Sequence, residues 1–316
     1  MDKQETALLE LGRVLRGYGY RFITPTPETH REINRRDGNG EGRSLTDIFG
    51  WSRPFGEAAL PPDLQRLLVD AGVLDSSGPL LRSTVRFSTL GDFLFVHSAF
   101  PTEFGDAVFF GPDTYRFARA IQTEMRSDGA APSTIVDIGT GSGAGAFVAA
   151  SLTSPQHVIV TDINPAALRL AEVNSALNEI AKVEFRQSDV LSDVAESADL
   201  ILCNPPYLVD ATHRVYRHGG GTWGFDLSLR IVREALEHLA PGGKLILYTG
   251  TPVVGGSDLF FAAVRPLLAD RNFRYAEIDP DVFAEELARP PYDVADRIAV
   301  VLLVVHASEQ VNEHAA

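Results

Sequence analysis

The spacing of hydrophobic residues changes along the chain at about residue 134. Before this point they recur mainly at helical spacing, in residues 8–15 (LLELGRVL) and again in residues 64–73. After it, short runs rich in β-branched residues alternate with longer segments of helical period. Such alternation is typical of a parallel sheet with helices on both faces.

The pattern predicts the following elements, named by residue number. Strands are expected at 134–138, 157–161, 183–187, 200–203, 244–249, 274–278 and 297–305, and helices at 144–152, 165–177 and 225–239. Earlier in the chain it predicts short strands at 85–87, 93–97 and 106–110, a surface loop at 35–44 and a helix at 111–125. The expected fold class is α/β: a seven-stranded, doubly wound, mostly parallel sheet with a small, mainly helical N-terminal domain.

Composition narrows the class of protein. The net charge is −14, which argues against a broad nucleic-acid-binding face, since such a face is usually basic. No apolar run reaches the roughly 18 residues that a membrane span needs. The start of the chain lacks a secretory signal pattern. Cys203 is the only cysteine, which excludes a disulfide within the chain and favours a reducing compartment. We therefore expect a cytoplasmic protein that does not bind membranes.

A glycine-rich turn follows the first strand of the alternating region. Asp137, Gly139, Gly141 and Gly143 form the pattern D-x-G-x-G-x-G at the start of the next predicted helix. Glycines at such a turn let a ligand approach the backbone closely. Asp162 follows the second strand, where an acid can accept hydrogen bonds from a ribose. Nicotinamide-dependent enzymes share both features, so these residues indicate a nucleoside but do not choose the cofactor.

The sequence Asn204-Pro205-Pro206-Tyr207, at the end of the fourth predicted strand, suggests the chemistry. An amide or aromatic amino nitrogen is a poor nucleophile because its lone pair is delocalised. The Asn204 side-chain oxygen and the Pro205 carbonyl can each accept one N–H from such a group, which turns the lone pair towards an incoming group. The prolines stiffen the loop, and Tyr207 offers a flat apolar face.

Four motifs in order carry a family resemblance: DIGTGSG, TDINPAAL, QSDVL and LCNPPYLVD. Over about residues 130–250 the chain resembles the Asn-Pro-Pro-Tyr group of class I methyltransferases, and within it the HemK-type protein-glutamine N5-methyltransferases. The segment FFGPDTYRF stands where those enzymes carry a Pro-Glu-Thr stretch, with Thr114 kept and Asp113 in place of Glu. GFDLSLRIVREALEHLAPGGKL resembles their following helix and strand.

The resemblance implies a fold, a cofactor and site residues. The final strand should run antiparallel, residues 1–105 should form a substrate-recognition or lid domain, and residues 106–316 should form the catalytic domain. The cofactor would be S-adenosyl-L-methionine, and the product S-adenosyl-L-homocysteine. Catalysis would fall to Asn204, Pro205, Pro206 and Tyr207. The cofactor would be bound by Thr114, Asp137, Gly139, Thr140, Gly141, Gly143, Asp162, Ile163, Asn164, Asp189, Val190 and Asn204.

The sequence alone does not decide between several possible methyl acceptors and partners. A glutamine side-chain amide of a protein is favoured, and the alternatives are a small molecule methylated on nitrogen or oxygen, an adenine of ribosomal RNA, or a regulatory protein without activity. Residues 210–224, with Arg214, Arg217 and three consecutive glycines, are expected to cover the substrate. His213 and His218 lack the further ligands that a metal site needs, so none is predicted. The oligomeric state is not readable from the sequence.

Overall fold

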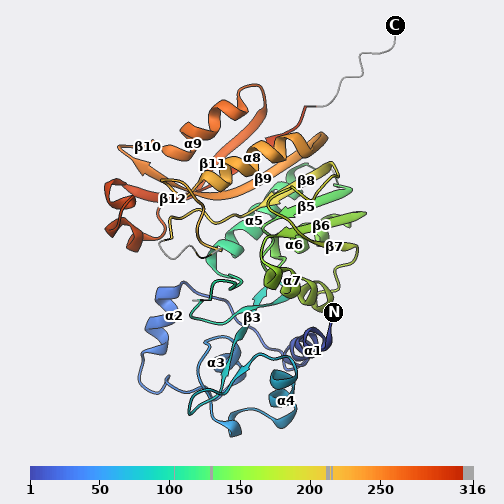
Figure 1. Cartoon of the computed structure of the whole chain (residues 1–316), viewed down its shortest axis with the longest axis vertical. Helices are drawn as coiled ribbons and strands as arrows, with labels where there is room; N and C mark the ends of the chain where they lie inside the picture. The colour runs from blue at the N-terminus through green and yellow to red at the C-terminus, as the bar shows by residue number, and fades with distance from the viewer. Residues whose placement is uncertain (103, 129–130, 211–213, 215, 309–316) are drawn as a thin grey trace. The chain divides into compact units, whose positions relative to one another are not determined.

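The computed structural model describes residues 1–102, 104–128, 131–210, 214 and 216–308 (Figure 1). The chain divides into two compact units that interleave along the sequence. The N-terminal unit consists of Met1–Arg116, Gly141–Ala144 and Asn164–Ala181. The sheet unit consists of Phe117–Thr140, Gly145–Ile163 and Lys182–Ala316. The domain boundary expected between residues 105 and 106 stays a prediction.

The sheet unit is built on one large sheet. Within the described residues it has eight strands, in the order β11-β12-β9-β8-β5-β6-β7, with the two-residue β10 paired to β9 outside this path. The strands are β5 (Thr134–Ile138), β6 (His157–Asp162), β7 (Val183–Gln187), β8 (Ala198–Cys203), β9 (Leu239–Val254), β10 (Ser257–Asp258), β11 (Asn272–Asp279) and β12 (Arg297–His306). The seven predicted strands are therefore confirmed.

The direction of the strands follows the expected topology. The neighbours β7, β6, β5, β8 and β9 run parallel to one another. The last strand, β12, lies between β9 and β11 and runs antiparallel to both. Eight consecutive apolar residues of β12 are buried, which is what a strand covered on both faces requires. The expectation of a mostly parallel sheet with an antiparallel final strand is confirmed.

Helices complete the sheet unit. They are α6 (Ala144–Thr153), α8 (Asp226–His238) and α9 (Leu259–Val264), while α5 (Pro112–Asp128) runs from the N-terminal unit into this one. The 3₁₀ helices are η2 (Arg265–Leu268), η3 (Ala284–Ala288) and η4 (Tyr292–Val294). Ile231 and Val232 of α8 and Phe260 of α9 share one buried core with apolar residues of β5, β8, β9 and β12. This core holds the strands in register and so fixes where each strand ends.

The N-terminal unit mixes helices with two small hairpins. Its helices are α1 (Lys3–Gly17), α2 (Pro27–Asn34), α3 (Leu45–Phe49), α4 (Pro62–Asp70), α7 (Pro165–Leu177) and the 3₁₀ helix η1 (Glu57–Ala59). The strand pairs are β1 (Leu74–Asp75) with β2 (Arg82–Ser83), and β3 (Val85–Leu90) with β4 (Phe93–Ser98). Helix α1 begins with a capping box in which Asp2 and Glu5 bond each other's backbone.

Helix α7 is tied into the N-terminal unit by two asparagines. The amide of Asn174 pairs with the backbone of Val96, accepting at 2.7 Å and donating at 2.9 Å. One helical turn later, Asn178 pairs in the same way with Leu94, at 3.0 and 2.9 Å. Because Leu94 and Val96 lie two residues apart on β4, the two amides satisfy one free edge of that strand.

Two local expectations meet different outcomes. Residues 35–44 are irregular and mostly exposed, as predicted for a surface loop. The strand predicted at 106–110 is wrong, because this segment is irregular apart from backbone pairing between Ser98 and Val108. Ala107, Val108 and Phe110 are nevertheless buried, which explains the apolar run that suggested a strand. No helix within the described residues is long and apolar enough to cross a membrane.

Candidate active site

The register of the sheet brings three predicted site residues to one edge. Strand β5 pairs in parallel with β6 on one side and with β8 on the other, and all three end at the same level. Gly139 follows β5, Asp162 ends β6 and Asn204 follows β8. The carboxyl edge of a parallel sheet is where ligands bind in this architecture.

The backbone of the glycine turn is shaped for close approach. Gly139, Gly141 and Gly143 have φ of 63°, 55° and 85°, a region that glycine adopts without steric cost. A Cβ atom added to Gly139 or Gly141 would meet nothing within 4 Å. The turn therefore leaves backbone exposed where a ligand could contact it, which fits the nucleoside end of the expected cofactor.

Asp137 organises this turn from inside the protein. Its side chain is buried, and Oδ2 accepts hydrogen bonds from the Thr140 hydroxyl at 2.7 Å and from the Ala146 N–H at 3.1 Å. Burial, with a smaller contribution from the charge of Asp162, raises the pKa of Asp137 to about 7. A Cβ on Gly145 would lie 3.2 Å from Asp137 Oδ2, so the helix start needs glycine there. The contacts of Asp137 are those of a residue that holds the turn.

The residues after β6 combine a buried acid with an exposed apolar side chain. Asp162 is 8% exposed and its carbonyl accepts the Ser188 N–H at 3.1 Å. Ile163 is 54% exposed, although most isoleucines are buried. Gln187 donates to the Ile163 carbonyl at 3.2 Å and so fixes the turn. An acid beside an open apolar surface matches a ribose with a neighbouring planar base.

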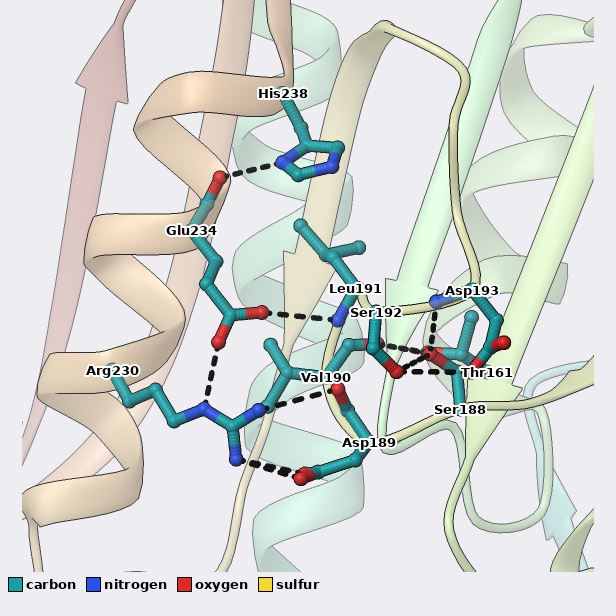
Figure 2. A network of polar contacts seen from close by, with 10 residues as sticks. All are labelled: Thr161, Ser188, Asp189, Val190, Leu191, Ser192, Asp193, Arg230, Glu234 and His238. Carbon is teal, nitrogen blue, oxygen red and sulfur yellow. Dashed lines mark hydrogen bonds and ion pairs between the residues drawn. The ribbon is translucent and has the colours of Figure 1, made fainter.

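Asp189 lies in an ion-pair network that Figure 2 shows from close by. Arg230 Nη1 donates to both carboxylate oxygens of Asp189 at 2.9 Å, while Arg230 Nε donates to Glu234 at 2.7 Å. Glu234 also accepts the Leu191 N–H at 3.2 Å. The network joins the loop after β7 to helix α8. The Asp189 side chain is 55% exposed, so its oxygens keep lone pairs open to solvent.

Val190, within the same loop, has a strained backbone. Its φ is 58°, a conformation that β-branched residues rarely adopt, and its side chain is buried. The Val190 carbonyl accepts hydrogen bonds from the hydroxyls of Thr161 at 3.3 Å and Ser188 at 3.2 Å. The loop after β7 is thus held in a set shape by bonds from β6 and from the loop itself.

Thr114 and Asn164, two predicted cofactor residues that lie in the N-terminal unit, each have a structural partner. The Thr114 hydroxyl accepts the Gly111 N–H at 3.2 Å at the start of α5. Asn164 caps helix α7 by accepting the Ala166 N–H at 2.9 Å, and donates to the Asp106 carbonyl at 2.8 Å. These hydrogen bonds give a structural reason for a threonine at position 114 and an asparagine at position 164. Their roles toward a cofactor remain predictions.

The Asn-Pro-Pro-Tyr motif joins an available amide to a packed aromatic ring. Asn204 is half-buried, and within the described part of the chain its side chain has no hydrogen-bond partner. Tyr207 is buried against β9, where a Cβ on Gly250 would lie 2.1 Å from its Cδ2. Cys203 is fully buried, donates to the Ile138 carbonyl at 3.2 Å and has a pKa raised by burial. Cys203 is therefore a core residue.

The segment 280–296, which links β11 to β12, packs on the residues after the motif. Its role was not predicted from the sequence. The only signal there is the presence of aromatic residues within a polar stretch. The Phe283 ring meets the Tyr207 ring edge-on with centroids 6.0 Å apart, and its own φ is 56°. The Tyr292 hydroxyl accepts the Val209 N–H at 3.0 Å and donates to the Trp223 carbonyl at 3.1 Å.

The arginines after the motif are paired with acids. Arg214 donates to the buried Asp210 carboxylate at 2.6 Å, and Arg217 donates to Glu286 at 2.5 Å. Arg217 also lies over the Phe283 ring, 5.6 Å from its centroid. The charges of Arg214 and Arg217 are therefore neutralised within the protein. His213 lies outside the described residues.

In the ranges that the structure describes, no three His, Cys, Asp or Glu side chains are grouped so that they could hold a metal ion.

In a comparison with known protein families, residues 118–253 match the model of the methyltransferase small domain family. A release factor glutamine methyltransferase of Cereibacter sphaeroides is 37% identical over 132 residues, which cover 37% of this chain and 47% of the relative. One of Lactococcus lactis is 35% identical over 150 residues, covering 44% and 54%. A ribosomal protein L11 methyltransferase of Lactobacillus johnsonii is 36% identical over 115 residues, covering 36% and 30%. The matches thus span about half the length of the release factor enzymes.

Solved structures agree on the fold. Trm5 of Methanocaldococcus jannaschii, solved with adenosine, has a TM-score of 0.50 at 15% identity, covering 72% of this chain and 57% of that one. Trm5b of Pyrococcus abyssi has a TM-score of 0.50 at 17% identity, covering 74% and 62%. The resemblance to class I, S-adenosylmethionine-dependent methyltransferases predicted from the motifs is therefore confirmed, and residues 118–253 match the methyltransferase small domain family.

Proposed function

We propose that the protein transfers a methyl group from S-adenosyl-L-methionine to a planar nitrogen, and that the acceptor is a glutamine side-chain amide of another protein. One observation carries the proposal. The unengaged Asn204 amide follows β8 at the sheet edge where β5 opens into its glycine turn. The residues expected to bind the methyl donor and those expected to bind the acceptor thus follow the ends of adjacent strands of one sheet.

The glycine turn and its neighbours suit the cofactor. The open backbone at Gly139 can lie against the nucleoside, and Asp162 can accept from the ribose hydroxyls. Ile163 presents apolar surface for the adenine. When bound, the cofactor supplies an electrophilic methyl group on a sulfonium, and S-adenosyl-L-homocysteine is the product. The relatives that share this segment are methyltransferases by name, which supports the assignment.

Asn204 and Pro205 act on the acceptor nitrogen. The Asn204 side-chain oxygen accepts one amide N–H and the Pro205 carbonyl accepts the other, so the lone pair turns towards the methyl. As the nitrogen becomes positively charged in the transition state, each bond strengthens and contributes roughly 1.5–3 kcal/mol. The fixed loop, held by Tyr207 against β9, removes much of the entropic cost of orienting the acceptor.

A protein acceptor is favoured over RNA by charge. The chain carries a net charge of −14, and Arg214 and Arg217 are already paired with Asp210 and Glu286. RNA phosphates would have to compete with these carboxylates. The release factor glutamine methyltransferases among the relatives support the same acceptor.

The proposal is tested by following a labelled methyl group into a cell extract. Wild type, Asn204→Ala and the surface variant Asn272→Ala would be incubated with labelled S-adenosyl-L-methionine, and the extract separated into protein, RNA and small molecules. We expect label in protein with wild type and Asn272→Ala, and a loss of at least tenfold with Asn204→Ala. Label in RNA or in small molecules would overturn the proposed acceptor. Absence of label with S-adenosyl-L-homocysteine still bound would count against the enzymatic proposal.

A further inference from the structure

A buried cation in the N-terminal unit takes no part in the site described above. Arg86, on β3, is 4% exposed. It stands directly opposite His97 on β4, and Ser88 lies two residues further along the same face of β3. Helix α2, drawn in blue in Figure 1, contributes His30 to this group. All of these residues belong to one compact unit.

The guanidinium of Arg86 uses only one of its edges. Nη1 lies 3.3 Å from Nδ1 of His30. His30 Nε2 lies 2.8 Å from the Trp51 carbonyl, which can only accept, so Nε2 carries the proton and Nδ1 accepts from Arg86. Arg86 Nε is buried and has no partner at all within the described chain. The edge formed by Nε and Nη2 is therefore unused.

The surrounding polar groups are neutral. His97 Nδ1 faces the Ser98 carbonyl at 3.1 Å, so its Nε2 accepts from the Ser88 hydroxyl at 2.8 Å, and Ser88 in turn bonds Thr24 at 2.5 Å. Burial and the Arg86 charge lower the pKa of His30 to about 4, so it is uncharged at neutral pH. No carboxylate among the described residues offsets the charge of Arg86.

A second buried arginine of the same unit shows the usual arrangement. Arg53 is 7% exposed, and its guanidinium forms an ion pair with Asp47 and donates from Nε to Asn34 at 3.0 Å. A buried cation without an anion is costly, because desolvation is not repaid by attraction or by hydrogen bonds. Arg86 therefore carries a charge that an anion from outside the chain would compensate.

We propose that the unused Nε and Nη2 edge of Arg86 binds the carboxylate of a small ligand. Two parallel N–H donors on one edge of a planar guanidinium match the two oxygens of a carboxylate and do not match a spherical ion. The near-complete burial of Arg86 and His30 favours a small group over a protein segment. This inference does not depend on the proposed methyl transfer.

Thermal unfolding in sodium acetate tests the proposal, with sodium chloride at equal ionic strength as the reference. We expect acetate at about ten times its Kd to raise the Tm of wild type by about 3 °C over chloride. Arg86→Met should lose this difference. The matched control, Arg53→Met, should melt at a lower temperature because Asp47 loses its partner, and should keep the acetate effect. Equal Tm values of wild type in the two salts would overturn the proposal.

A measurement on wild type alone covers the case in which Arg86→Met does not fold. The Arg86 Nε–H is buried and should give an exchange-protected signal in the ¹⁵N spectrum of the arginine side chains. Titration with acetate should shift one protected Nε–H signal in a saturable way. Protected Nε–H signals that do not move with acetate would exclude a carboxylate at this edge.

Discussion

At the scale of the residue, the titration of Asp137 should make the stability of the folded protein depend on pH. An ordinary aspartate titrates near 3.8, and burial raises the pKa of Asp137 to about 7 in the folded protein. Between these values the folded state holds a proton that the unfolded state has lost, so stability falls as pH rises from about 4 to 7. Asp137 should account for up to about 4 kcal/mol of this loss.

Asp137→Asn should remove this part of the pH dependence. The amide keeps an oxygen for Thr140 and has no charge to desolvate. Urea unfolding of the cofactor-free protein at pH 4 to 8 would measure it, with exposed Asp92→Asn as the control. A wild-type curve that Asp137→Asn reproduces unchanged would show that burial does not shift this carboxyl.

Single residues could be predicted only where a motif fixes their place. Asn204 and Asp162 were placed by following predicted strands, and the register of the sheet brings their strand ends together as expected. Arg230, the partner of Asp189, lies 41 residues away on another element, and no local pattern indicates that pairing. The hydrogen bonds of Thr114 and Asn164 likewise depend on backbone geometry that the sequence does not reveal.

At the scale of the element, the segment 280–296 should set the position of the acceptor loop. Glu286→Ala removes the partner of the half-buried Arg217, which also lies over Phe283 beside Tyr207. We expect methyl transfer to fall about fivefold, corresponding to roughly 1 kcal/mol, with unchanged affinity for S-adenosyl-L-homocysteine. Steady-state rates and calorimetry would be compared with Glu285→Ala, an exposed neighbour. Equal rates for the two variants would refute a positioning role.

Helix α7 offers a second test at this scale. Asn174 is fully buried and makes three hydrogen bonds, two to Val96 and one to the Ser142 carbonyl. Asn174→Ala leaves these backbone groups unpaired and should lower the free energy of unfolding by roughly 2–4 kcal/mol. Chemical denaturation with exposed Arg169→Ala as the control measures this. A loss no larger than that of the control would mean that α7 is held by apolar contacts alone.

The helices and strands differ in how clearly the sequence predicts them. Strands such as β12 are continuous β-branched runs, and α7 has a clear cap and period, so both were predicted. Residues 106–110 show the limit, because a buried apolar run without ladder pairing looks the same in sequence as a strand. Helices α2 and α3, of eight and five residues, are too short to show a period.

At the scale of the whole molecule, fold and activity rest on different kinds of information. Alternating strands and helices predicted the sheet, while the antiparallel place of β12 came only from the family resemblance. The acceptor depends on surfaces that local patterns do not specify, and the same fold supports many substrates. The acidic net charge, which is a property of the entire chain, is what favours a protein over RNA.

The most direct test of the central claim is tandem mass spectrometry of the protein that receives the methyl group. We predict a single added methyl on the side-chain amide nitrogen of a glutamine, formed by wild type and by Asn272→Ala and missing with Asn204→Ala. A methyl group on a lysine, an arginine or a backbone amine, or one that persists with Asn204→Ala, would contradict the account.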